Sequence, residues 1–380
     1  MARPHRGWIL RTAVPLGLLT TLALAGCSSE RTKSLDTLDA KGENAEAINE
    51  LGFPVYIAAV VVAVLVIAVI LLIVVKFRQR PDEAEELPTQ LHGNTTLEIT
   101  WTMIPALILV AFAVPTVLLI QDLNAEAKDS ITVKVEGQQW WWQFTYDMDE
   151  DGEYGTDGDI VTAGELVIPA GQQINLLVTS NDVIHSFWIP PLNGKRDAVP
   201  GLESFWKIQA DEPGTYLGQC TEFCGLSHAN MRMLTRAKTA EEFDAWVANQ
   251  LEPVDVGSLP AEAQKGAETF TSLCSACHLV NGVNNAQYGN ASELVSGVGP
   301  NLTHLASRGT FAGAILNLHE IGEGGVGDPS EPIVTADLEA WIRNPEAVVP
   351  QAPDEGRGMP NLGLTEQQID EVVAFLITLE

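Results

Sequence analysis

Two cysteines and a histidine stand close together in the run Cys274-Ser-Ala-Cys277-His278. Thiols at this spacing can add to the two vinyl groups of one porphyrin, and the histidine that follows can reach the iron as its proximal ligand. A disulfide or half of a zinc site would use the same two cysteines, but no cysteine follows Cys277 to complete a zinc site. The run therefore predicts a covalently attached haem c.

The second axial ligand of that haem is sought among the residues that follow. Met359 is the only methionine beyond Cys277, and it lies in Gly358-Met359-Pro360-Asn361 ahead of a predicted C-terminal helix. A thioether ligand raises the reduction potential of the iron relative to a second imidazole. We expect Met359 to be this ligand, with His304 and His319 as the alternatives.

A second group of soft ligands lies in Cys220-Thr-Glu222-Phe-Cys224-Gly-Leu-Ser-His228-Ala-Asn-Met231. Two thiolates, an imidazole and a thioether within one short segment suit copper far better than calcium or magnesium. His185 is the only histidine between residues 93 and 227, so it is the candidate for a second imidazole. A disulfide between Cys220 and Cys224 is the alternative. It leaves the spacing of the histidine and the methionine unexplained.

Two kinds of module carry these clusters. From residue 130 to about 249, short alternating runs broken by Gly, Pro and Asn predict an antiparallel β sandwich or barrel. A helix is expected over residues 240–250, and a short hinge rich in Pro, Gly and Ser follows it. Beyond residue 260, apolar residues at helical spacing predict helices over 261–274, 335–343 and 365–379.

Two uncharged apolar stretches precede the modules. Leu51–Val75 has 25 residues, which gives a helix of about 37 Å at 1.5 Å per residue, enough to cross a bilayer. Ile99–Gln121 is the second such stretch. Lys76, Arg78 and Arg80 follow the first stretch, so the connection between the spans is expected in the cytoplasm and both ends of the chain outside.

The beginning of the chain is typical of a secretory signal. Arg3, Arg6 and Arg11 occur without any acidic residue, and an uncharged stretch follows up to Leu24-Ala25-Gly26-Cys27. That ending resembles a bacterial lipobox, in which Cys27 would be acylated and would become the first residue of the mature chain. An uncleaved anchor helix is the alternative. A lipid at Cys27 would add an anchor but not a span.

The charge balance limits the partners of the chain. Its 380 residues include 21 basic and 50 acidic side chains, for a formal net charge of −29. Such a charge repels phosphate backbones and argues against nucleic-acid binding. The hydrophobic share of 46% excludes wholesale disorder.

Four segments of the sequence resemble subunit II of the haem-copper cytochrome c oxidases, over residues from about 54 to 249. They are the soft-ligand segment, Asp182–Trp188, the aromatic run Gly137–Trp142, and Leu97–Thr102 at the start of the second span. Residues 261–380 resemble class I cytochromes c. Their landmarks are Lys265-Gly266-Ala267, Phe270 and the turn Gly299–Leu302. The chain is thus similar to the subtype of subunit II that carries its own cytochrome c.

The resemblance implies a multidomain membrane protein. Its parts would be a two-helix transmembrane hairpin, an all-β cupredoxin-like sandwich and an all-α class I cytochrome c domain. The expected boundaries are 1–26 for a lipoprotein signal peptide, 27–50 for an extracytoplasmic segment, 51–122 for the hairpin, 123–250 for the copper domain, 251–260 for a linker and 261–380 for the cytochrome c domain. The linker would set the reach of the tethered haem.

The resemblance also implies roles for the copper ligands. Cys220 and Cys224 would bridge two copper ions in a CuA centre, and His185 and His228 would each bind one ion. Met231 would be a weak axial ligand, and the backbone carbonyl of Glu222 would be the other. The Glu222 side chain would face a magnesium or manganese ion shared with subunit I.

Two further residues receive roles in the same way. Trp140 matches the position through which electrons enter the copper site, whereas Trp141 and Trp142 are candidates for core aromatics. Glu98 matches a carboxylate at the mouth of a proton path into subunit I, and a solvated helix end is its alternative. The aromatic run departs from many relatives at Gln138, where they have His, and at Trp141, where they have Tyr.

The function implied is that of an electron-entry subunit in a bacterial cell membrane. Electrons would arrive on haem c from cytochrome c or a bc-type reductase, pass to CuA, and continue to subunit I, where oxygen is reduced to water with proton translocation. Subunit III would be a further partner. A nitric oxide reductase subunit and a membrane-tethered copper chaperone are the alternatives. A chaperone of thioredoxin-like fold would need alternating strands and helices, which residues 130–235 do not predict.

Overall fold

The structure is a computed structural model that describes residues 35–78, 90, 92–128, 130–156, 158–285, 298–322 and 324–380. The predicted signal peptide with Cys27, most of the connection between the two spans, and most of the loop at 281–298 lie outside the described residues. Two domains follow the helices: residues 130–250 form the β domain and residues 261–380 the helical domain.

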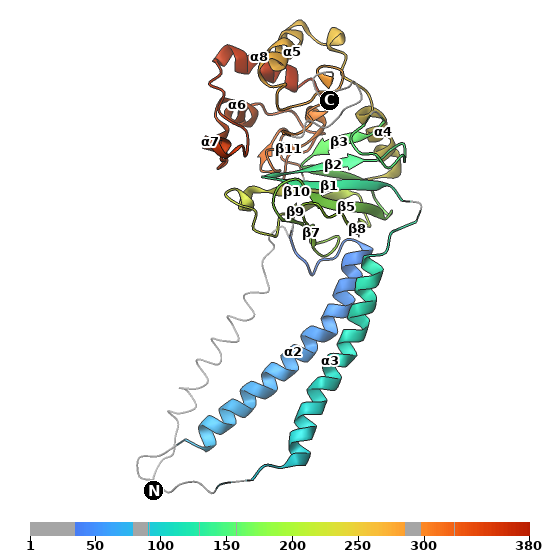
Figure 1. Cartoon of the computed structure of the whole chain (residues 1–380), viewed down its shortest axis with the longest axis vertical. Coiled ribbons are helices and arrows are strands. Elements are labelled where there is room, and N and C mark those ends of the chain that lie inside the picture. Colours follow the sequence, from blue (N-terminus) through green and yellow to red (C-terminus); the bar gives the residue numbers. More distant parts are fainter. Residues whose placement is uncertain are drawn as a thin grey trace, which may run out of the picture. The chain divides into compact units, whose positions relative to one another are not determined.

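Two long helices carry the predicted spans (Figure 1). Helix α2 (Glu43–Lys76) begins eight residues before the predicted span, and helix α3 (Thr95–Leu123) begins after Asn94, whose side chain accepts a hydrogen bond from the Leu97 amide. Both helices are long and apolar enough to cross a membrane, and the apolar segments of both are exposed. The first turn of α2 meets the β domain, where Asn44 Nδ2 donates to Gln173 Oε1 at 3.2 Å.

The β domain is a sandwich, as predicted, but its sheets are mixed and not purely antiparallel as the alternating runs led us to expect. Among the described residues one sheet has the order β3-β2-β1-β5-β8, a second has the order β4-β10-β9, and β6 pairs with β7. Two neighbouring pairs, β1 with β5 and β4 with β10, are parallel. The strands are β1 (Thr132–Gln138), β2 (Trp141–Tyr146), β3 (Ile160–Ala163), β4 (Glu165–Pro169), β5 (Ile174–Ser180), β6 (His185–Phe187), β7 (Arg196–Ala198), β8 (Ser204–Ile208), β9 (Gly214–Gln219) and β10 (Arg232–Lys238).

Alternation along the strands places their apolar side chains in one core between the sheets. Trp142, Phe144 and Tyr146 of β2 are fully buried there. The Tyr146 hydroxyl accepts a hydrogen bond from the Val167 amide at 2.7 Å and donates one to the Val167 carbonyl at 2.8 Å, so this buried polar group is paired. Helix α4 (Ala240–Gln250) closes the domain, and a Thr239–Glu242 capping box starts it.

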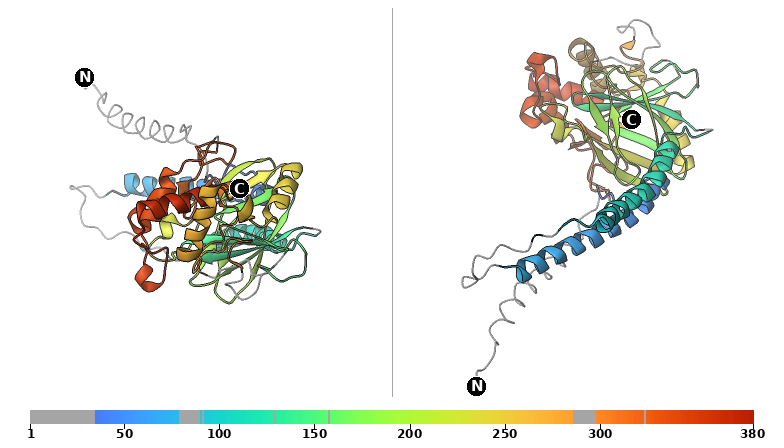
Figure 2. Two further views of the ribbon diagram at one scale, coloured as in Figure 1. Left: turned by 90° about the horizontal axis from the view of Figure 1, so that it is seen from above. Right: turned by 60° about the horizontal axis from the view of Figure 1, so that its bottom comes forward.

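The helical domain has its own core, which lies between its first and last long helices. Its helices are α5 (Ala261–Leu273), α6 (Ala336–Arg343), α7 (Pro345–Val348) and α8 (Glu366–Leu376), drawn in orange to red in Figure 2. Helices α5 and α8 cross closely, because a Cβ on Gly266 would lie 2.0 Å from the carbonyl oxygen of Glu371. The rings of Phe270 and Phe375 pack there at 5.4 Å. Only glycine fits this crossing.

The segment between the two domains is packed rather than loose. Its short 3-10 turn η2 (Val256–Ser258) follows Val254, whose amide donates to the Asn281 carbonyl at 2.9 Å. The side chains of Val254, Val256 and Leu259 pack against the core of the helical domain. The domains also share direct hydrogen bonds, such as that from the Arg232 amide to the Gly313 carbonyl at 3.0 Å.

Candidate metal centre and haem cavity

The soft-ligand segment forms a compact loop between two neighbouring strands. Cys220 follows β9 directly, and Met231 precedes β10. The Cys220 amide donates to the Met231 carbonyl at 2.9 Å, which closes the base of the loop. Between them, His228 begins a 3-10 turn, η1 (His228–Asn230). The antiparallel pairing of β9 and β10 thus brings both ends of the segment together.

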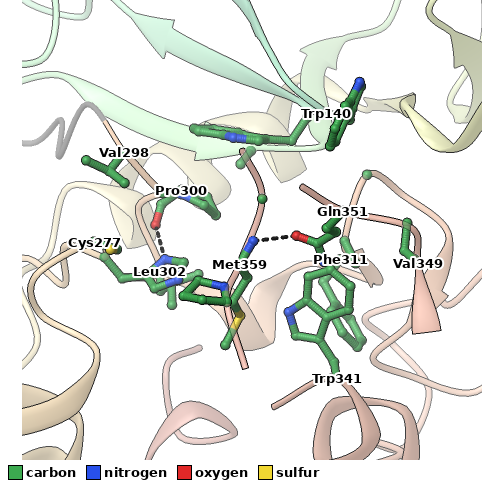
Figure 3. Close-up of a pocket in the computed structure, with 18 of the residues that line it drawn as sticks. Trp140, Cys277, Val298, Pro300, Leu302, Phe311, Trp341, Val349, Gln351 and Met359 are labelled. Atoms are coloured by element: carbon green, nitrogen blue, oxygen red, sulfur yellow. Dashed lines mark hydrogen bonds between the residues drawn. The ribbon is translucent and has the colours of Figure 1, made fainter. Parts of the chain in front are cut away.

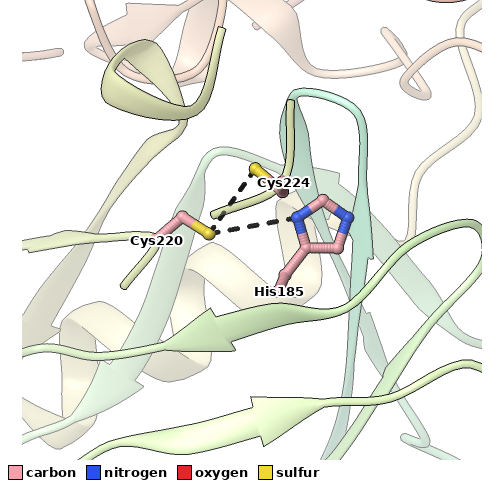
Figure 4. Close-up of side chains that lie close together, drawn as sticks. All are labelled: His185, Cys220 and Cys224. Atoms are coloured by element: carbon pink, nitrogen blue, oxygen red, sulfur yellow. Dashed lines mark hydrogen bonds between the residues drawn. The ribbon is translucent and has the colours of Figure 1, made fainter. Parts of the chain in front are cut away.

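The structure gathers the predicted copper ligands at one point, and Figure 4 shows three of them, His185, Cys220 and Cys224. The sulfur atoms of Cys220 and Cys224 lie 3.8 Å apart, and both thiols are buried and free. The distance from His185 Nδ1 to Cys220 Sγ is 3.9 Å, and that from Glu222 O to the same sulfur is 3.3 Å. The donors around Cys224 Sγ are His228 Nδ1 at 3.5 Å and Met231 Sδ at 3.7 Å.

This donor set fits copper and not a disulfide. A disulfide bond is about 2.05 Å long, so the sulfur atoms at 3.8 Å are not joined. Two metal–sulfur bonds of about 2.3 Å can span that separation. Thiolate, imidazole and thioether donors together are the ligands that soft copper prefers. The chemistry of the loop therefore agrees with the copper site expected from the sequence.

The ring of His185 is oriented by a residue that the sequence did not single out. Its Nε2 lies 2.9 Å from Asp182 Oδ1, so Nδ1 is directed at the sulfur atoms. Asp182 Oδ2 also accepts the Gln139 amide at 2.8 Å. Burial acts to raise the pKa of Asp182, but the hydrogen bonds from His185, Gln139 and Val183 outweigh it and lower this pKa. A carboxylate that orients a ligating histidine is a usual second layer of a metal site.

The two thiols differ in acidity in the metal-free chain. The hydrogen bond from Cys224 lowers the pKa of Cys220, and the same interaction raises the pKa of Cys224. Because one thiolate beside another is disfavoured, the pair holds a proton until a cation replaces it. A metal ion would supply that positive charge.

The predicted haem residues line a single cavity (Figure 3). Its volume is about 370 Å³, and Cys274, Cys277, His278 and Met359 all contribute to its wall. His278 Nδ1 contacts the Pro300 carbonyl at 3.0 Å, so Nε2 is the candidate iron ligand. Burial lowers the pKa of His278, which keeps the imidazole neutral and able to bind a metal. The cavity lies within the size range of small-molecule sites.

The two alternative axial ligands do not reach this cavity. His304 contacts the carbonyls of Glu380 and Glu252 through its two ring nitrogens, at 2.6 and 3.1 Å. His319 contacts the carbonyls of Glu331 and Ala306 in the same way, at 2.7 and 2.9 Å. Both histidines hold loops of the helical domain in place, which leaves Met359 as the candidate.

Arg308 is a further residue of the cavity wall that sequence reasoning missed. It is buried, its Nη2 donates to the Asn301 carbonyl at 2.7 Å, and its Nε has no partner among the described residues. Burial lowers its pKa to about 10, so the guanidinium stays charged at neutral pH. A buried cation in the wall of a haem cavity suits the anionic propionate groups of the porphyrin.

The aromatic run lies between the two sites. Trp140 lines the haem cavity, and its Nε1 donates to the Cys224 carbonyl at 3.0 Å. Gln139 Nε2 donates to the same carbonyl at 2.6 Å. Trp142 is instead fully buried, with its ring 5.8 Å from that of His185 and 5.5 Å from that of Phe187. Trp140 therefore bridges the sites. Trp142 supports, from the core, the soft-ligand segment Cys220–Met231, which we call the copper loop.

Glu98 and the side chain of Glu222 lie apart from both sites. Glu98 is in the first turn of α3 and is exposed. The Glu222 side chain is exposed on the copper loop, whereas its carbonyl faces Cys220. Phe223 beside it is 76% exposed. None of these residues lines the haem cavity.

Comparison with known proteins places the chain in a family. Residues 131–238 match the family described as cytochrome C oxidase subunit II, periplasmic domain, residues 32–119 match its transmembrane domain, and residues 263–380 match cytochrome c. These domains imply CuA copper in the β domain and haem c in the helical domain.

Individual proteins agree. Cytochrome c oxidase subunit 2 of Alkalihalophilus pseudofirmus is 35% identical over 97% of this chain and 96% of its own length. That of Bacillus sp. strain PS3 is 31% identical over 80% of each chain. The crystal structure of the periplasmic domain of subunit II of cytochrome oxidase from Bradyrhizobium japonicum is 32% identical, with a TM-score of 0.29, and covers 33% of this chain and 96% of that one. The match along nearly the whole length means that this chain belongs to the cytochrome c oxidase subunit II family, with a cytochrome c domain fused to it, and is part of a haem-copper oxidase complex.

Proposed function

We propose that the chain takes up electrons on haem c and delivers them through a CuA centre to subunit I of the oxidase. The observation that carries this proposal is the position of Trp140, which lines the haem cavity and donates to the Cys224 carbonyl at 3.0 Å. One side chain thus touches both candidate sites. Haem c and CuA, when bound, supply one-electron chemistry.

The helical domain would hold the haem by four residues. Cys274 and Cys277 would hold the porphyrin through their sulfur atoms, and His278 and Met359 would bind its iron. The Pro300 carbonyl orients His278, and the Met359 amide donates to the Gln351 side chain. Much of the remaining wall is apolar, with Phe270, Leu302 and Leu376 among its residues.

The β domain would hold the copper ions by the loop between β9 and β10. Cys220 and Cys224 would supply thiolate ligands to the ions, and the remaining ligands would be His185, His228, Met231 and the Glu222 carbonyl. All these ligands come from a rigid sandwich, and Asp182 fixes the ring of His185. Rigid ligands limit the rearrangement that accompanies each electron transfer.

A second series of hydrogen bonds connects the two sites. Ser227, the neighbour of His228, donates from its hydroxyl to the Pro350 carbonyl of the helical domain. Pro350 precedes Gln351, whose side chain accepts the Met359 amide. Hydrogen bonds therefore link the segment of one candidate iron ligand to the segment of one candidate copper ligand.

The partners follow from the exposed groups and the membrane helices. Phe223 and Leu226, 76% and 62% exposed, flank Cys224 and offer an apolar surface to subunit I. The exposed Glu222 carboxylate would hold the shared magnesium or manganese ion there, and Glu98 would open the proton path. Subunit III would complete the complex. The donor would be cytochrome c or a bc-type reductase.

The membrane placement is proposed in the same way. Both helices would cross a bacterial cell membrane, with the chain ends outside, because Lys76 ends α2 and Arg78 follows it. Acylation of Cys27 would anchor the mature N-terminus. Lys and Arg residues next to a span favour the cytoplasmic side of the membrane.

A crossed pair of variants in the assembled complex tests the proposal. Replacing both thiols of the loop, Cys220→Ser with Cys224→Ser, is expected to remove two copper ions per complex and the near-infrared CuA band while the haem c spectrum stays. Cys277→Ser is expected to weaken haem attachment while both copper ions stay. Unchanged copper content in the first variant would refute the copper site.

Electron delivery is tested separately with the aromatic run. Trp140→Phe is expected to slow electron transfer from haem c to copper after flash reduction. Trp141→Phe is the matched control, because it changes the same cavity wall but keeps the bond from Trp140 to the Cys224 carbonyl. Equal rates in the two variants would refute the role of Trp140. Uptake of oxygen, compared with that of nitric oxide, by the same complex decides the terminal acceptor.

A further inference from the structure

A buried ion pair lies in the β domain, away from the copper loop. Glu165 is the first residue of β4, and Arg236 lies on the neighbouring strand β10. Arg236 Nε is 2.6 Å from Glu165 Oε2, and Arg236 Nη2 is 3.3 Å from Glu165 Oε1. Their side chains are only 9% and 2% exposed. A buried carboxylate needs more than one donor to offset its lost hydration.

Within the β domain, Arg236 Nη1 also donates to Thr215 Oγ1 of β9 at 3.3 Å. Further donors and acceptors come from the helical domain. The amide and the hydroxyl of Thr310 both donate to Glu165 Oε1 at 2.7 Å. Arg236 Nη2 also donates to the Gly327 carbonyl at 2.7 Å. Thr310 lies on β11 (Thr310–Phe311) and is 1% exposed. Both charged side chains thus have hydrogen-bond partners far along the chain, 145 positions beyond Glu165 and 91 beyond Arg236.

The fit around the pair is close. A Cβ on Gly309 would lie 2.2 Å from Arg236 Nη2 and 2.0 Å from the Gly327 carbonyl oxygen. No side chain can occupy that position without moving the backbone. Further hydrogen bonds between the domains lie on either side, from the Arg232 amide to the Gly313 carbonyl and from Gln250 Nε2 to Ser307 Oγ at 3.1 Å.

We infer that Glu165 and Arg236 are positioning residues that hold the helical domain docked on the β domain in one arrangement. Without the helical domain, Glu165 would lose the two hydrogen bonds from Thr310, and Arg236 would lose the Gly327 carbonyl. The linker then does not set the reach of the haem, because the domains are fixed to each other by this pair. The wall of the haem cavity that contains Trp140 exists only in the docked arrangement.

The inference rests on the proposed function only for its consequence, which is a constant path for electrons. The docking itself is tested by hydrogen exchange on the assembled oxidase, where no electron transfer is involved. Glu165→Gln leaves the Arg236 charge without a carboxylate. Breaking one partner of a buried pair is costly. We expect amide exchange in residues 309–318 to rise on the order of 100-fold by local opening, while strands β1 and β5 stay protected.

A matched control and a second variant keep the test decisive. Glu366→Gln removes the carboxylate of the exposed Arg343–Glu366 pair, whose atoms lie 2.7 Å apart at the surface of the helical domain, and is expected to leave exchange unchanged. Thr310→Val keeps both charges and the size of the side chain, and is expected to raise exchange in the same segment. Thr310→Val therefore provides the test if the Glu165→Gln complex does not assemble.

Two results would overturn the inference. One is unchanged exchange at 309–318 in a folded Glu165→Gln or Thr310→Val complex. The other is an increase of equal size in β1 and β5, which would mean that the pair merely stabilises the β domain. Loss of electron transfer in an otherwise docked, unmutated complex would instead refute the proposed function and leave the docking intact.

Discussion

Asp182→Asn tests whether the second layer of the copper site controls metal affinity. Asp182 accepts three hydrogen bonds, from His185 Nε2 at 2.9 Å, from the Val183 amide at 2.7 Å and from the Gln139 amide at 2.8 Å. An asparagine has the same shape but only one accepting oxygen. In either orientation its amino group therefore faces a donor.

The size of the effect follows from these contacts. The best orientation keeps the hydrogen bond from His185, but its acceptor becomes a neutral amide oxygen instead of a carboxylate. The asparagine amino group then faces the backbone N–H of Gln139, so that two donors oppose each other. A hydrogen bond to a charged group contributes about 1.5–3 kcal/mol. Partners of ligating histidines typically change metal affinity about 10- to 100-fold. We expect a loss of copper affinity in this range.

The assay is competition for copper against a chelator of known affinity, followed by the near-infrared band of the oxidase. Asp197→Asn is the matched control, because Asp197 is exposed on β7 and pairs with Ser186 beside His185. If Asp182→Asn keeps its fold and its copper affinity stays within about twofold of the control, then ring orientation by Asp182 does not govern this site.

Three further changes probe the helical domain. Met359→His is expected to retain the covalent haem and to lower its reduction potential, measured by redox titration, because imidazole replaces thioether; an unchanged potential would exclude Met359 as a ligand. Gly266→Ala is expected to destabilise the domain by about 1–3 kcal/mol in thermal unfolding, because its Cβ would meet the Glu371 carbonyl at 2.0 Å, whereas a Cβ on Gly214 meets nothing closer than 3.6 Å and provides the control. The Lys265 ammonium, 2.5 Å away, lowers the pKa of Glu371 to about 2. This carboxylate stabilises the fold above its ordinary pKa, and the stabilisation is lost as pH falls from about 4.5 to about 2; Glu371→Gln should flatten the acid limb of the unfolding curve, and an unaltered limb would contradict the assignment.

The copper ligands could be predicted because most of them are close in sequence. Cys220, Cys224, His228 and Met231 lie on one loop, and the type and spacing of their side chains are enough to indicate soft-metal chemistry. Asp182 could not be found in this way. Its role depends on which ring nitrogen of His185 it meets, and that is set by the pairing of β6 with β7.

The histidines of the helical domain show a related limit. An imidazole in the sequence is a possible iron ligand until its neighbours are known. In the structure, His304 and His319 each contact two backbone carbonyls, so they serve the fold instead. Arg308 was overlooked for the opposite reason, since an arginine in a loop reads as a surface residue unless its burial is known.

The alternation of apolar and polar residues likewise did not predict which strands pair or in which direction. The pattern of β1 and β5 indicates strands with buried faces, but alternation is the same in parallel and antiparallel pairs. The parallel pairs of β1 with β5 and of β4 with β10 arise from the path of the chain across the sandwich. The second of these pairs places Glu165 beside the strand of Arg236, which no local pattern predicts.

The two departures from the common aromatic run acquire a physical explanation from the position of the helical domain. Gln138 and Trp141 are the residues that differ from many relatives, and both line the cavity that the β domain shares with the helical domain. This turn therefore forms part of a cavity wall that residues of the helical domain complete. Restoring His at 138 or Tyr at 141 should therefore disturb the haem cavity before it disturbs the copper loop, because Cys224 is held by Gln139 and Trp140 instead.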